Sequence, residues 1–177
     1  MIALTEDKRM LGYGVMTPYS NIFCFATTRR GGFSKGDYAS FNCTPYTGDD
    51  AESVRRNQEL LCNSMPQQPK ELVIPFQTHG TKVKVIDEKY LNATSDERTA
   101  MLQGVDALIT KEPGCCICIS TADCIPILLY DRKSQVVAAA HAGWRGTVNY
   151  IAGHTLDRMR ALYGTDGKDV IACIGPG

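Results

Sequence analysis

The chain has 177 residues, a length sufficient for one well-buried domain and too short to predict two. Hydrophobic residues make up 44% and charged residues 21%, close to the average of globular proteins, which argues against disorder. Nineteen lysines and arginines balance nineteen acidic residues, so the basic excess typical of proteins that bind nucleic acid or membrane surfaces is absent. We therefore expect neither nucleic acid nor a membrane as a partner.

The N-terminal residues and the cysteine usage predict a cytoplasmic protein. Glu6 and Asp7 stand where a secretory signal needs a basic start followed by an apolar run. No apolar stretch approaches the roughly 18 residues that cross a bilayer. The eight cysteines are a smaller share of the chain than in disulfide-built scaffolds, and several lie in apolar runs, so we expect them to be reduced.

The first half of the chain predicts few elements, separated by glycine-rich and polar turns. Short strands are expected at residues 22–28, 73–78 and 83–86. A helix should begin after Asp49 or Asp50, either of which can cap it, and continue through Leu61. The polar segment 92–99 favours a loop or a short exposed helix.

The second half alternates short apolar runs with turn residues. Strands are expected at residues 107–110, 115–120, 126–130, 136–140 and 170–174. Because these runs are continuously apolar, they indicate strands buried on both faces of a layered sheet. The clearest helix follows Gly146, where apolar residues from Val148 to Leu162 recur at offsets of three and four before Gly164 ends it. We predict an α/β fold, with a mixed sheet flanked by helices.

Two of the three histidines and one cysteine lie at the ends of predicted strands or in the following turns. They are His79, Cys124 and His141. Because α/β folds place ligand sites at strand ends, we expect these side chains to converge on one transition-metal ion. Two imidazoles and one thiolate suit zinc and leave a fourth position open for water or substrate, as in a catalytic site. The same ligands could also hold copper.

Each of these residues alone has a simpler interpretation. A single histidine at a strand end usually makes structural hydrogen bonds, and a single cysteine after an apolar strand usually fills the core. The remaining histidine, His154, is expected on the surface of the last helix. The Cys-x-x-Cys pair at residues 115–118 is similar to that of zinc nucleobase deaminases, but no His-x-Glu partner accompanies it. We therefore expect these cysteines to be strand residues.

The segment after His141 runs from a strand through two glycines into the start of a helix. Free backbone N–H groups and the helix dipole at such a junction attract an anion, and Arg145 adds a planar charged group. A phosphate or carboxylate beside the metal is one interpretation. A glycine turn with a solvent-facing arginine is the other. Trp144, the only tryptophan, either walls a pocket or covers the core.

Seven short motifs are spread along the chain: residues 27–34 (TTRRGGFS), 41–42 (FN), 48–50 (GDD), 54–57 (VRRN), 77–80 (QTHG), 121–126 (TADCIP) and 141–146 (HAGWRG). Taken together, these motifs resemble the laccase-domain family, whose members are described as multicopper polyphenol oxidases and as purine nucleoside phosphorylases. The resemblance implies that His79, Cys124 and His141 bind the metal. It also implies a layered α/β sandwich similar to cysteine-hydrolase toxins. The chain ends inside a family motif, so we expect a single laccase-family domain over residues 1–177 that lacks the C-terminal segment.

The resemblance implies a purine nucleoside enzyme. Its substrates would be adenosine, inosine, guanosine and methylthioadenosine, cleaved with phosphate to the base and ribose 1-phosphate or methylthioribose 1-phosphate, with adenosine deaminase activity in addition. Asn42 and Arg145 match family positions near the pocket and are implied substrate contacts. Cys124, His141 and Asp123 are the expected catalytic residues, with Asp123 moving protons beside the thiolate.

Two alternatives remain open. A Cys–His amidohydrolase acting on a peptidoglycan precursor would use Cys124 as its nucleophile and His141 as its base. A stoichiometric metal on Cys124 would remove the thiolate from that role. A non-catalytic zinc-binding interaction module would need no substrate. A copper oxidase is disfavoured because several coppers need more than three histidines. The physiological substrate, the native metal and the oligomeric state stay open.

Overall fold

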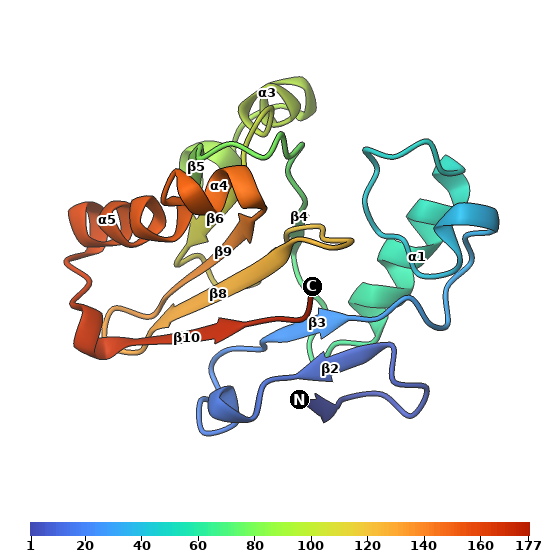
Figure 1. Cartoon of the computed structure of the whole chain (residues 1–177), viewed down its shortest axis with the longest axis horizontal. Helices are drawn as coiled ribbons and strands as arrows, with labels where there is room; N and C mark the ends of the chain where they lie inside the picture. The colour runs from blue at the N-terminus through green and yellow to red at the C-terminus, as the bar shows by residue number, and fades with distance from the viewer. The chain divides into compact units, whose positions relative to one another are not determined.

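The computed structural model describes residues 1–177, which group into two compact units, Met1–Pro69 and Lys70–Gly177 (Figure 1). None of its helices has the length and the apolar character that a membrane crossing requires. The expectation of one laccase-family domain over residues 1–177 stays a prediction.

The Met1–Pro69 unit contains a small antiparallel sheet and one long helix (Figure 1). The strands, in sheet order, are β1 (Ile2–Ala3), β2 (Met10–Gly12) and β3 (Phe25–Thr27), and 3₁₀ turns cover Gly14–Met16 and Gly36–Tyr38. The helix α1 (Ala51–Asn63) begins after Asp50, whose carboxylate accepts a hydrogen bond from the Ser53 backbone N–H at 2.9 Å. The predicted cap is therefore confirmed, whereas the strand expected at 22–28 shortens to β3.

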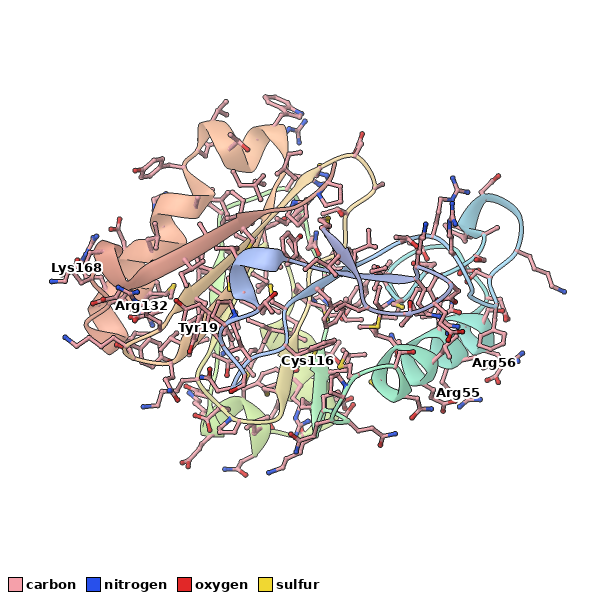
Figure 2. The ribbon with its side chains drawn as sticks, turned by 90° about the horizontal axis from the view of Figure 1, so that it is seen from below. Tyr19, Arg55, Arg56, Cys116, Arg132 and Lys168 are labelled. Carbon is pink, nitrogen blue, oxygen red and sulfur yellow. The ribbon has the colours of Figure 1, made fainter.

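The exposed face of α1 carries the pair Arg55 and Arg56, which project from the helix (Figure 2). Arg55 pairs with Glu52 at 2.6 Å, and the Arg56 guanidinium lies 3.8 Å from the centre of the Phe33 ring. Both arginines thus have partners inside their own unit, as expected of a solvated helix face.

The Lys70–Gly177 unit is built on a five-stranded mixed sheet in the order β10-β8-β9-β6-β5. Its strands are β5 (Val83–Ile86), β6 (Ala107–Thr110), β8 (Ile125–Asp131), β9 (Val136–Ala142) and β10 (Val170–Ile174). Strands β5 and β6 run parallel, and the other neighbours are antiparallel. A separate parallel pair joins β4 (Glu71–Val73) to β7 (Cys115–Ile117).

Both faces of this sheet are covered, which explains the continuously apolar strands. On one face, Leu108 of β6 packs in a cluster with Tyr90 of α2 (Glu88–Leu91). On the other, Ile109 of β6 packs with Met159 of α5 (Ile151–Tyr163). Because successive strand residues point to opposite faces, an apolar residue is needed at every position. The predicted α/β fold with a mixed sheet flanked by helices is confirmed.

The single helix expected after Gly146 is wrong, because two helices occupy this region. The first, α4 (Trp144–Val148), begins before Gly146, and α5 follows it. Tyr150 separates them with a left-handed φ of +65°. Its ring lies over Gly153, where a β-carbon would stand 1.8 Å from the ring. Gly164, with φ +68°, ends α5 as predicted.

The remaining differences concern the edges of predicted strands. The segment 92–99 contains the start of the short helix α3 (Ser95–Met101), which is capped by Thr94 and Glu97 acting on each other's backbone. A 3₁₀ turn covers Gly167–Asp169. The strand expected at 73–78 ends with β4 at residue 73, and the one expected at 115–120 ends with β7 at residue 117. The segments 74–80 and 118–124 are therefore loops, and each carries one of the three predicted metal ligands.

Candidate metal centre

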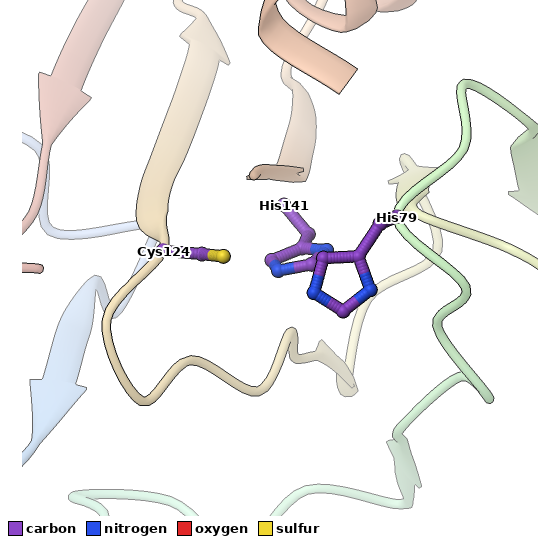
Figure 3. Close-up of side chains that lie close together, drawn as sticks. All are labelled: His79, Cys124 and His141. Carbon is purple, nitrogen blue, oxygen red and sulfur yellow. The ribbon is translucent and has the colours of Figure 1, made fainter. Parts of the chain in front are cut away.

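Three potential metal ligands gather in the Lys70–Gly177 unit (Figure 3). His79 comes from the loop before β5, Cys124 precedes β8 directly, and His141 lies near the end of β9. The pairing of β8 with β9 sets Pro126 opposite His141, which brings the residues before β8 close to that histidine. The sheet register thus explains how two ligands separated in sequence meet.

The geometry of the cluster fits a small metal ion. The ligand atoms of the three side chains lie within 4.8 Å of one another. Bonds of about 2.0–2.3 Å to a tetrahedral zinc ion place neighbouring ligand atoms about 3.5 Å apart, so small side-chain rotations would close the set. His141 is buried, Cys124 is half-buried and His79 is exposed, which leaves one side of the cluster open to a fourth ligand.

Asp106 fixes the orientation of His141. The Nδ1 atom of His141 lies 2.9 Å from the Asp106 carboxylate, and both side chains are buried. An ionised carboxylate only accepts hydrogen bonds, so Nδ1 donates and Nε2 keeps its lone pair. A carboxylate holding a ligand histidine in this way is a common feature of zinc sites. The His141 backbone N–H adds a bond to the Asp106 carbonyl at 2.8 Å.

The same carboxylate holds the backbone around His79. It accepts the N–H groups of Thr78 at 3.2 Å, His79 at 2.9 Å and Gly80 at 2.8 Å. His79 has a φ of +61°, a left-handed conformation that costs a non-glycine residue about 1 kcal/mol or more. Three converging N–H groups on one buried anion offset that cost. One aspartate therefore positions both histidines.

Gly143 lets the backbone approach the cluster closely. A β-carbon there would lie 3.0 Å from Cδ2 of His79 and 3.1 Å from Sγ of Cys124. Both distances are tighter than ordinary van der Waals contact. A glycine at this position therefore leaves room for the imidazole and the thiol to face each other.

The charges around the cluster favour a cation. Burial by itself raises the pKa of Asp106, but hydrogen bonds from His141 and from the backbone of Gly80 and Thr78 outweigh it and hold that pKa below its ordinary value. Burial raises the pKa of the Cys124 thiol, and the negative charge of Asp123 raises it further. Two carboxylates therefore disfavour a free thiolate here and would stabilise a positive ion bound to the sulfur.

Two of the other predicted site residues lie in the same unit. Asp123 is exposed and adjoins Cys124 in the chain. Arg145 is exposed on α4, with its guanidinium 5.3 Å from the centre of the Trp144 ring. Trp144 itself is 71% exposed, so it does not cover the core. Because α4 has five residues, its dipole is short, and the substrate contact of Arg145 stays a prediction.

Asn42 belongs to the Met1–Pro69 unit. Its Nδ2 group donates to Thr47 and to Asp49 at 3.0 Å each, and its Oδ1 accepts the Thr44 N–H at 3.1 Å. The amide thus organises its own loop, and the predicted contact with substrate stays a prediction.

The remaining histidine and cysteines lie outside the cluster. His154 is exposed on α5, as predicted. None of the eight cysteines forms a disulfide bond. Cys115 and Cys116 lie on β7, as expected, and Cys118 follows its end; Cys116 is labelled in Figure 2.

The sequence offered weak signals for two residues that shape the centre. Asp106 is the single charged residue inside the run Val105–Thr110, where a carboxylate needs partners that the sequence does not identify. Gly143 follows His141 by two positions. The sequence alone explains this glycine by a turn, and not by close contact between the backbone and the ligand side chains. Both roles depend on distant segments, which a single sequence does not place.

A family model described as multi-copper polyphenol oxidoreductase laccase matches residues 23–177. Among curated relatives, a purine nucleoside phosphorylase of Bacteroides thetaiotaomicron is 63% identical over 176 residues, covering 99% of this chain and 65% of that protein. Adenosine deaminase RL5 from an unknown prokaryotic organism is 41% identical over 150 residues, covering 79% of this chain and 57% of that protein. The chain therefore spans less than two thirds of the length of these relatives.

Solved structures show the same relationship. The crystal structure of YlmD from Geobacillus stearothermophilus matches with a TM-score of 0.86 and 31% identity, over 98% of this chain and 64% of that chain. The sequence and structural matches extend over most of this chain, and the family match over residues 23–177 includes the loops that carry the three clustered side chains. This chain belongs to the multi-copper polyphenol oxidoreductase laccase family.

Proposed function

We propose that this chain forms the metal-binding part of an enzyme that acts on purine nucleosides. The observation that carries the proposal is the cluster of His79, Cys124 and His141, together with relatives named for nucleoside phosphorolysis and adenosine deamination. The reactions proposed are cleavage of adenosine, inosine, guanosine and methylthioadenosine by phosphate, and hydrolysis of adenosine to inosine and ammonia.

Zinc suits the ligand set better than copper as the resident metal. Two imidazoles and one thiolate are typical zinc ligands, and three protein ligands leave one position free for chemistry. When bound, zinc supplies a Lewis acid and lowers the pKa of a coordinated water molecule to about 7. The two carboxylates near the cluster would add electrostatic attraction for the ion.

Individual roles follow from the positions of the side chains. Asp106 holds the proton of His141 on Nδ1, which directs Nε2 toward the cluster. Asp123 is exposed beside Cys124 and is proposed to exchange protons with the substrate or water. Arg145 is proposed to bind phosphate through its exposed guanidinium, and Asn42 is proposed to contact the nucleoside. The cytoplasmic location also stays a prediction.

The test pairs metal analysis with product chromatography. Purified protein incubated with adenosine and phosphate should contain one zinc ion per chain and release adenine, inosine or both. Cys124→Ala should lose the zinc and the products, because a methyl group cannot ligate the ion. Cys62→Ala, which changes a thiol of α1 outside the cluster, should keep both. Undiminished turnover in the Cys124→Ala variant would contradict the proposal.

A Cys–His amidohydrolase acting on a peptidoglycan precursor is the second candidate. The observation in its favour is that His141 lies between Cys124 and Asp106 in space, as a base lies between a nucleophile and an orienting carboxylate. His79 has no role in such a triad. His79→Ala should therefore spare an amidohydrolase and inactivate the metal enzyme. Protein that binds zinc stoichiometrically but turns over neither substrate class would instead be an interaction module.

A further inference from the structure

The loop that carries Cys124 is attached to the loop that carries His79 by one side chain. Gln77 donates from Nε2 to the Ser120 carbonyl at 2.8 Å and accepts the Ser120 N–H at Oε1 at 2.7 Å. These bonds join residues 43 positions apart in sequence. Gln77 stands two residues before His79, and Ser120 stands four residues before Cys124.

These two bonds extend the pairing of β4 with β7 beyond the ends of both strands. The register of that pair aligns Val73 with Ile117, and the Cys118 N–H still donates to the Val73 carbonyl at 2.9 Å. Beyond this point the backbones separate into the two ligand loops. The Gln77 amide takes the place of a neighbouring strand, because it offers one donor and one acceptor to a single residue.

The two sides of the cluster are fixed in different ways. Asp106 holds the backbone at residues 78–80 and the ring of His141. The donors to that carboxylate are the Thr78, His79 and Gly80 N–H groups and the His141 ring, none of which belongs to the Cys124 loop. Residues 121–123 of that loop are exposed. Gln77 joins the loop that Asp106 holds to the loop that carries the sulfur. We propose that Gln77 is a positioning residue that sets the distance between the Cys124 thiolate and the two imidazoles, and thereby the affinity and geometry of the metal centre.

This inference rests on the proposed metal centre and adds a specific requirement to it. Only a side chain of this length with both a donor and an acceptor satisfies Ser120. In Gln77→Glu, one carboxylate oxygen can accept the N–H, but the other faces the Ser120 carbonyl without a proton to donate. In Gln77→Asn, the amide keeps both groups but is one methylene shorter. In both variants the loop that carries Cys124 should therefore be held less firmly, whereas His79 and His141 should stay in place.

Cobalt(II) is a suitable probe because thiolate ligation has its own absorption. A thiolate bound to cobalt gives a charge-transfer band in the near ultraviolet, whereas tetrahedral coordination gives bands in the visible. We expect the wild-type protein to show both. Gln77→Glu should bind cobalt and zinc about 10–100-fold more weakly, the range for outer partners of metal ligands, with a weakened thiolate band. Gln77→Asn should show a smaller loss of the same kind.

The matched control is Gln58→Glu, which removes a side-chain donor to the Cys43 carbonyl at 2.8 Å in the Met1–Pro69 unit. It should leave the affinity and both spectra unchanged. Wild-type affinity and a full thiolate band in Gln77→Glu would overturn the inference alone. If that variant does not fold, the same result in Gln77→Asn would overturn it. Wild-type protein that binds neither metal would overturn the proposed centre and this inference together.

Discussion

Two buried aspartates of the Lys70–Gly177 unit use the same chemistry over very different distances in sequence. Asp131, at the end of β8, accepts the backbone N–H groups of Lys133 at 2.9 Å and Ser134 at 3.0 Å. Asp106 accepts N–H groups from the loop around His79 and from the His141 ring. Both side chains are almost completely buried. One aspartate closes a local turn, and the other assembles a site.

The comparison shows what burial of a carboxylate achieves in each place. A buried anion needs several hydrogen-bond donors. Successive backbone N–H groups of a turn supply them, because they already point toward one place. The backbone donors to Asp131 are two and three residues ahead of it, in the β8–β9 turn. The donors to Asp106 lie 26 to 28 residues before it and 35 residues after it. Removing this carboxylate should therefore disturb the His79 loop and the His141 ring, but not the Cys124 loop directly.

The largest effect is expected from removing each carboxylate. Asp106→Ala leaves three backbone N–H groups and one imidazole N–H without an acceptor, and should lower the free energy of unfolding by about 3–5 kcal/mol. It should also abolish zinc binding. Asp131→Ala leaves two N–H groups unpaired and should cost about 1–3 kcal/mol, with zinc binding retained. Urea titration and metal analysis measure both quantities. Equal zinc affinity in the two variants would remove the distinction between the aspartates.

A smaller effect on stability and zinc affinity is expected at Gly143, where uncharged backbone lies against the cluster. Gly143→Ala places a methyl group against His79 and Cys124, and overpacking of this kind costs about 1–3 kcal/mol. Because the contacted atoms belong to potential ligands, zinc affinity should fall by about tenfold or more. Gly167→Ala is the control, since a β-carbon there meets nothing within 4 Å. Full zinc binding by Gly143→Ala would show that the ligands can move aside.

The pH dependence of stability, compared between wild type and an Asp131 variant, should report on Asp131. Burial by itself raises the pKa of Asp131, but hydrogen bonds led by the Ser134 N–H hold it below its ordinary value. A pKa lowered in the folded state stabilises the protein above the unfolded pKa of about 3.9 and stops doing so as pH falls through the folded value. The stability difference between wild type and Asp131→Asn should therefore be constant from about pH 5 to 7.

Below about pH 4 that difference should narrow, as urea titrations at a series of pH values would show. Asp157→Asn serves as the control, because Asp157 is exposed and pairs with Arg160 at the surface of α5. A surface pair of this kind contributes little to stability. A difference that stays constant down to pH 3 would mean that the hydrogen bonds to Asp131 do not favour its ionised form.

The same contrast between local and distant partners decides what the sequence could predict. The apolar runs predicted β6, β8, β9 and β10 closely, because burial on both faces requires an apolar residue at every position. Asp50 was predicted as a helix cap because its partner is three residues away. The loops 74–80 and 118–124 were partly taken for strands, since their apolar residues resemble strand residues.

The three clustered side chains were predicted from their residue types and from the resemblance to a family, and the structure brings them together. The residues that hold them were not. Asp106 and Gln77 act through partners more than 25 positions away, and no periodicity in the chain marks such a pairing. Tyr150 is a further example, because its backbone is left-handed and its ring occupies the place where a β-carbon of residue 153 would stand.

The smallest effect is expected where the same type of bond is local and exposed to solvent. Thr94 caps α3 by accepting the Glu97 N–H at 3.4 Å, and it is exposed. Water can replace the lost partner there, so Thr94→Ala should cost about 1 kcal/mol, the usual value for a cap, with no change in zinc binding. Thr99→Ala, in the same helix, is the matched control, because its hydroxyl donates to the Ser95 carbonyl and alanine favours the helix. Urea titration of both variants should therefore show a loss only for Thr94→Ala. A loss of stability as large as that of Asp131→Ala would mean that the separation of the bonded residues in sequence, and not their burial, sets the strength of these hydrogen bonds.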